Sequence, residues 1–132
     1  MKTKFLSILI LCLSVSAFAD GLTESSLVGQ YSLTGNGGFL SYNLVFNSDG
    51  TIESNQTSLD GTVIFCHGLY RLKESSQNLL AVYNCPAGEV VTQETSLADV
   101  TLTGLQTGAA IEVRIKSSLG TDSTVHMVLT RK

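Results

Sequence analysis

The chain has no tryptophan, a single proline and few charged residues, which make up 14% of its 132 positions. Its 8 lysine and arginine residues are outnumbered by 11 acidic ones, so it lacks the basic face that nucleic-acid binding requires. No internal repeat and no low-complexity tract interrupts it. This composition favours one small globular domain and argues against a nucleic-acid partner, a multidomain protein and a membrane span.

Residues 1–19 have the pattern of a secretory signal peptide. Two lysines precede an apolar run over residues 5–15, and Ala-Phe-Ala at residues 17–19 forms a small-x-small cleavage site. Removing 19 of the 132 residues leaves 113, the size of one domain over residues 20–132. Without the two leader lysines, six basic and eleven acidic residues give a formal charge of −5.

The three cysteines divide between these two parts of the chain. Cys12 lies within the predicted signal peptide, after large aliphatic residues rather than the small residue that precedes a lipid-modified cysteine, so no lipid anchor is expected. Cys66 and Cys85 remain in the mature chain. We expect a secreted or periplasmic protein, and in such an oxidising compartment two cysteines are most simply one disulfide. Free thiols and a reactive or metal-binding pair are the alternatives.

From residue 29 onward the apolar residues recur with period two and are interrupted by turn residues. This alternation is typical of an antiparallel all-β domain, a sandwich or a barrel. A short helical turn is expected at residues 23–27, and no other helix. In the segment 98–105, Val100 and Leu102 are expected to point inward. The predicted strands are 28–34, 40–46, 51–56, 62–72, 79–85, 89–94, 98–105, 109–116 and 124–131.

One predicted hairpin has a register that two independent patterns support. If residues 73–78 form its loop, pairing Cys66 with Cys85 places Gly68 opposite Tyr83 and puts the apolar residues of both strands on one face. A slip of one residue would put the cysteines on opposite faces. The agreement predicts a structural disulfide within this hairpin. The other facing pairs are Leu72 with Leu79 and Tyr70 with Ala81.

The start of the first predicted strand, Gly29-Gln30-Tyr31, resembles the Gly-x-Trp opening of lipocalin-like barrels. The segment Cys66-x-Gly68-x-Tyr70-Arg71-Leu72 is similar to a central hairpin of small exported lipocalin-like domains. The resemblance implies an antiparallel up-and-down β-barrel of about eight strands, with Arg131 of the last strand over the Tyr31 ring. It implies no particular ligand, and the tryptophans that line the biotin site of avidin-like barrels are absent.

The sequence nominates no catalytic group, metal site or cofactor. Its two histidines, His67 and His126, lie on the outward faces of predicted strands, and no metal-ligand or nucleophile motif accompanies them. The glycine-rich stretch at residues 36–38 lies between two strands, without the helix that a phosphate site needs. We expect a protein that is not an enzyme.

Tyr42, Tyr70 and Tyr83 are predicted to face inward and are the candidate ligand-binding residues. Three buried tyrosines can line a pocket with an apolar body and polar points, or they can simply fill the barrel. The first function considered is binding of a small apolar molecule inside the barrel. The alternative is a protein-interaction module or protease inhibitor that contacts a secreted protein through its loops or residues 20–27. An enzyme and an outer-membrane barrel rank below both.

Overall fold

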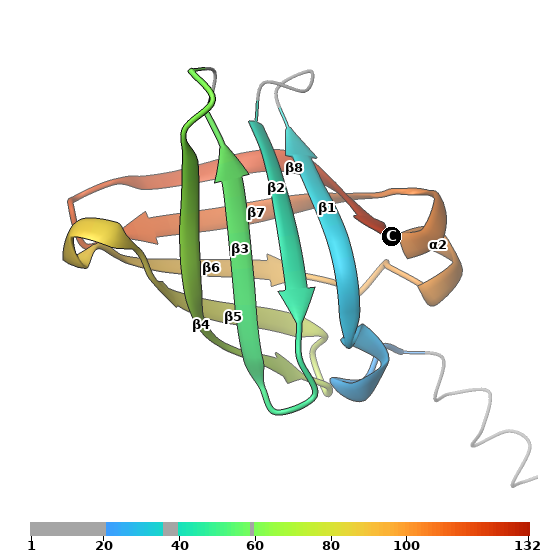
Figure 1. Cartoon of the computed structure of the whole chain (residues 1–132). Coiled ribbons are helices and arrows are strands. Elements are labelled where there is room, and N and C mark those ends of the chain that lie inside the picture. The colour runs from blue at the N-terminus through green and yellow to red at the C-terminus, as the bar shows by residue number, and fades with distance from the viewer. Residues whose placement is uncertain (1–20, 36–39, 59) are drawn as a thin grey trace, which may run out of the picture.

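Eight antiparallel strands close into a barrel in which every strand pairs with its neighbours in chain order and β1 pairs with β8 (Figure 1). The computed structural model describes residues 21–35, 40–58 and 60–132. The predicted signal peptide at residues 1–19 and the loop at residues 36–38 lie outside these ranges. The strands are β1 (Gly29–Gly35), β2 (Leu40–Phe46), β3 (Thr51–Thr57), β4 (Val63–Lys73), β5 (Asn78–Asn84), β6 (Val90–Ser96), β7 (Ala109–Ser117) and β8 (Asp122–Arg131).

This topology confirms the predicted all-β, antiparallel up-and-down barrel. Strands β1–β4 form one wall and cross the direction of β6–β8 on the opposite wall (Figure 1). We call the end of the barrel that holds the β5–β6 and β7–β8 connections and the last residues of β1 and β3 the disulfide end. The other end, which carries the β2–β3, β4–β5 and β6–β7 connections and the first residues of β1, is called the N-terminal end. Within the described residues, no helix is long and apolar enough to cross a membrane.

The hairpin of β4 and β5 has the predicted register. Gly68 faces Tyr83 and Leu72 faces Leu79, with the inward residues of both strands at most 7% exposed from Tyr70 to Tyr83. Cys66 and Cys85 form the expected disulfide, with their Cα atoms 4.4 Å apart. Because disulfides persist in oxidising surroundings, the bond indicates such a compartment for the protein.

The segment predicted as a strand at residues 98–105 is instead a turn followed by the first four residues of a helix, which corrects the sequence interpretation. Helix α2 (Leu102–Thr107) begins after Thr101, whose hydroxyl accepts a hydrogen bond from the Gly104 amide at 3.0 Å. Leu105 is fully buried, whereas Leu102, which was expected to point inward, is 44% exposed. A capping hydroxyl of this kind stabilises the first turn of a helix, and here this preference prevails over the short apolar alternation that predicted a strand.

The N-terminal end of the barrel is closed by the chain that precedes β1. The 3-10 turn η2 (Ser25–Leu27) agrees with the predicted helical turn, and both Leu22, which precedes it, and Leu27, its last residue, are buried. The Gln77 side chain accepts a hydrogen bond from the Leu22 amide and donates one to the Leu22 carbonyl, both at 2.8 Å. Residues 21–28 are therefore docked against the barrel rather than free.

Arg131 links the last strand to this closure. Its guanidinium donates to the carbonyl oxygens of Ser26 and Val28, at 3.2 and 2.9 Å. It also lies over the Tyr31 ring, 5.8 Å from the centroid, within the range of a cation–π contact. The placement of Arg131 over Tyr31 that the lipocalin resemblance implied is confirmed.

Candidate functional site

The three candidate tyrosines do not form one cluster, because Tyr70 lies at the N-terminal end of the barrel. Its ring packs edge-on against Phe46, and Phe46 packs edge-on against Tyr31, with centroids 4.9 and 5.1 Å apart. The Tyr70 hydroxyl donates to the Asn47 carbonyl at 2.9 Å. Tyr70 therefore packs within this end of the barrel, and its hydroxyl is already hydrogen-bonded within the protein.

Tyr83 and Tyr42 form a separate pair toward the disulfide end. Tyr83 is only 2% exposed, and its hydroxyl has no hydrogen-bond partner among the described residues. Burial raises the pKa of Tyr83 well above its usual value, and the nearby Tyr42 hydroxyl raises it further. Burial likewise raises the pKa of Tyr42, which is partly exposed. Both hydroxyls are thus neutral donors, in surroundings that disfavour negative charge.

A small cavity lies inside the barrel beside Tyr83. Its volume is about 30 Å³, which suits one water-sized group, whereas pockets for organic ligands measure roughly 300–1,000 Å³. Its lining is largely aliphatic, with the polar residues Tyr83, Gln93 and Thr95 among it. The cavity beside Tyr83 therefore has room for one functional group of a ligand, such as a carbonyl or hydroxyl group, but not for the rest of the molecule.

Inward side chains become more accessible toward the disulfide end. At the N-terminal end most inward residues are buried, Thr95 and Ala109 being partly exposed, while those nearer the disulfide are only partly covered. We call the latter, together with Tyr83, the disulfide-end interior. Its members are Tyr42, Gln56, Tyr83, Val91, Gln93, Ile115 and Val125. It combines aliphatic surface with two hydroxyls and two amides, a mixture suited to an amphiphilic molecule.

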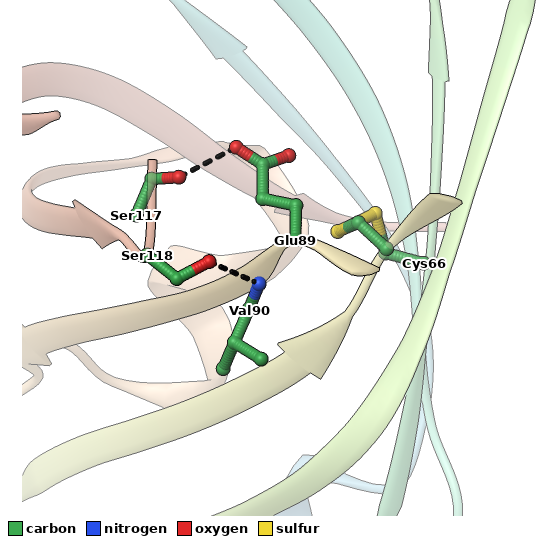
Figure 2. Close-up of a disulfide and its surroundings, with 6 residues drawn as sticks. Cys66, Glu89, Val90, Ser117 and Ser118 are labelled. Atoms are coloured by element: carbon green, nitrogen blue, oxygen red, sulfur yellow. Dashed lines mark hydrogen bonds between the residues drawn. A yellow bond between two sulfur atoms is a disulfide. The ribbon is translucent and has the colours of Figure 1, made fainter. Parts of the chain in front are cut away.

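The connections around this end are braced by polar contacts as well as by the disulfide (Figure 2). The Ser117 hydroxyl donates to a Glu89 carboxylate oxygen at 2.6 Å, and the Ser118 hydroxyl accepts from the Val90 amide at 2.9 Å (Figure 2). These bonds tie the β5–β6 connection to the β7–β8 connection. The β5–β6 and β7–β8 connections are therefore linked to each other beside the candidate site.

Sequence reasoning missed Gln56 and Gln93 as parts of this site. Both are polar residues at inward positions, Gln56 facing Tyr42 and Gln93 facing Ala81. The signal was the period-two alternation itself, which assigns Gln93 to the same face as Val91. His67 and His126 are exposed, as expected. Residues 21–35, 40–58 and 60–132 contain no group of three side chains placed to hold a metal ion.

Comparison with models of known families, with curated proteins and with solved structures gives no match to this chain. The eight-stranded closed barrel agrees with the lipocalin resemblance at the level of architecture. Membership of that family stays a prediction, carried by Tyr31, Arg131 and the central hairpin.

Proposed function

We propose that this protein is a non-catalytic binding protein that takes a small, largely apolar molecule into the disulfide-end interior. The observation that carries the proposal is the Tyr83 hydroxyl, which is buried without a partner in the described part of the chain. A buried donor left unpaired costs roughly 1–3 kcal/mol. A ligand that offers an acceptor to this hydroxyl regains that free energy on binding.

The site restricts the chemistry of the ligand. Because burial raises the pKa values of Tyr42 and Tyr83, the surroundings favour a neutral acceptor, such as a ketone, ester or alcohol oxygen, over a carboxylate. The cavity beside Tyr83 admits only that polar group. The apolar body would lie along Val91, Ile115 and Val125, which are partly exposed toward the disulfide end.

Titration with 2-octanone and 1-octanol, followed by two-dimensional NMR of the isotopically labelled protein, tests this proposal. We expect shift changes at inward residues of β2, β5, β6 and β7. Tyr83→Phe should weaken binding roughly two- to tenfold, the net value of one hydrogen bond. Tyr70→Phe is the matched control, since it removes a hydroxyl that is bonded at the other end. Equal affinities in both variants, or changes confined to the outer wall, would refute the proposal.

The alternative is a protein-interaction module that contacts its partner through the loops of the disulfide end. Two observations favour it: the β5–β6 and β7–β8 connections are bonded to each other, and Leu119 in the β7–β8 connection is 74% exposed. Docking of residues 21–28 against the barrel speaks against inhibition by a free N-terminal arm. Capture of a partner from the exported fraction that is lost in Leu119→Ser and kept in Tyr83→Phe would support this alternative.

A further inference from the structure

A row of residues whose charges alternate runs over the outer surface of the barrel, from β4 across β5 to β6 and β7. Register pairs Arg71 of β4 with Leu80 of β5, Leu80 with Glu94 of β6, and Glu94 with Arg114 of β7. Asp49 extends the row at its other end, because the Tyr70 amide donates to the Gly50 carbonyl at 3.0 Å and continues the pairing of β3 with β4 into the turn. The order is Asp49, Arg71, Leu80, Glu94 and Arg114, or negative, positive, neutral, negative and positive.

Leu80, at the centre of this row, belongs to an exposed apolar surface that extends into the next row. Leu69, Leu80 and Val82 are 64%, 41% and 38% exposed. Leu69 faces Val82 directly, and Leu80 lies two residues from Val82 on the same face of β5. Two surface grooves, of about 660 and 410 Å³, meet at Arg71 and Leu80, which line both. Apolar side chains gathered in this way on a charged surface are typical of interaction sites.

The two charged residues that flank Leu80, Arg71 and Glu94, form no ion pair with other described residues. The one ion pair found across the described residues joins Arg114 to Asp122 at 3.7 Å between exposed side chains, which contributes little. The row therefore presents both signs of charge to an incoming surface.

We propose that a second copy of this chain docks on the row, related by a two-fold axis that runs along β5 through Leu80. Such an axis reverses the order of the strands, so that β4 of one copy faces β6 of the other. Leu80 then meets Leu80, Arg71 meets Glu94 of the other copy, and Asp49 meets Arg114. Every charge in the row meets its opposite, as a self-complementary two-fold interface requires.

The flanking rows are compatible with the same axis. On one side, register places Asn78 between Lys73 and Ser96, so the lysine would meet a serine of the other copy. On the other side, Val82 lies between Leu69 and Thr92, so Leu69 would meet a threonine. Over strands β4 to β6, neither row brings like charges together. A partner of uniform charge would face repulsion from half of the central row, which is why a second copy fits it better.

Sedimentation velocity of the full mature chain, over a micromolar to millimolar concentration series, tests the proposal. We expect reversible dimerisation that Leu80→Asp weakens at least about tenfold, the scale set by burying an unpaired charge at an interface centre. Val128→Asp is the matched control, because Val128 of β8 is 40% exposed on another part of the wall. Dimerisation of Val128→Asp should equal that of the unmodified chain, and circular dichroism should show both variants folded.

Charge reversal makes the test specific to the axis. Arg71→Glu and Glu94→Arg should each weaken the dimer, because each places like charges together, and the double variant should restore it. A chain that stays monomeric over the whole series overturns the proposal. Equal effects of the Leu80 and Val128 variants overturn it too, as does a double variant that is weaker than either single one.

Discussion

Replacing Cys66 and Cys85 together by alanine is expected to lower the free energy of unfolding by about 3 kcal/mol. The two cysteines are 19 positions apart, and their bond closes a loop of that size in the unfolded chain. In the chain-entropy model, releasing a loop of about 20 residues restores roughly 11 cal/mol/K to the unfolded state. At room temperature this entropy corresponds to the stated loss.

The folded barrel should change little in this variant. Pairing of β4 with β5 continues to His67 opposite Asn84, next to the disulfide, so the ladder holds both positions in place without the bond. Alanine preserves the inward apolar character of the two sites. The loss therefore arises mainly in the unfolded state.

Urea unfolding monitored by circular dichroism measures the loss directly. The dependence of the unfolding free energy on urea should steepen, because the unfolded chain without the bond exposes more surface. The thermal midpoint should fall by about 10–20 °C, as expected for this loss in a chain of this size. A loss below about 1 kcal/mol would refute the reasoning, as would two free thiols in the unfolded, unreduced protein.

Three further substitutions test local features. Gly68→Ala should cost at least about 2 kcal/mol in urea unfolding, because the added Cβ would lie 1.8 Å from a carbonyl oxygen of the facing strand; unchanged stability would contradict that close approach. Tyr83→Phe should raise unfolding free energy by about 1 kcal/mol without ligand, since it removes an unpaired buried hydroxyl, and a loss of that size would mean the hydroxyl is satisfied. Hydrogen bonds from the Ser58 hydroxyl and the Thr62 amide lower the pKa of Asp60 from 3.8 to about 2, so its contribution to stability is present above pH 4 and lost as pH falls toward 2. Asp60→Asn should flatten the pH dependence of the thermal midpoint in that window, and an unchanged slope would exclude the effect.

The β4–β5 hairpin was predictable because two constraints of different origin agree on it. Period-two alternation identifies the inward face, and the cysteine pair identifies which residues face each other, so Gly68 could be set opposite Tyr83. Elsewhere the alternation identified faces alone. The partners of each strand then followed from the up-and-down topology, which joins strands in chain order.

The helix α2 was missed because its first residues alternate as a strand would. Val100 and Leu102 are separated by one threonine, and the pattern favoured a strand over 98–105. The decisive signals were weaker ones, a capping threonine at position 101 and a glycine at position 108, where φ is 107°. Thr101 and Gly108 bracket a helix of only six residues, too short for a 3.6-residue period to appear in the sequence.

The candidate site was only partly predictable, since alternation gives the face of a residue but not its height in the barrel. Tyr70 and Tyr83 both point inward, yet Tyr70 bonds to Asn47 at the N-terminal end and Tyr83 lies two residues before Cys85 of the disulfide. Height depends on the stagger accumulated around all eight strands, a property of the closed sheet rather than of any one strand. Tyr70, whose hydroxyl is already hydrogen-bonded, is therefore separated from the neighbouring residues Tyr42 and Tyr83.

The same limit concealed the charged row on the outer wall. Its members come from the β2–β3 turn and four successive strands, and no stretch of sequence brings Arg71 next to Glu94. Only the assembled register reveals that their signs reverse about Leu80.

A two-fold axis along β5 would place the disulfide ends of both copies on the same side of the dimer. Leu80→Asp should weaken association at least about tenfold while leaving the octanone affinity of the disulfide-end interior unchanged, so that each of the two proposals can fail without the other.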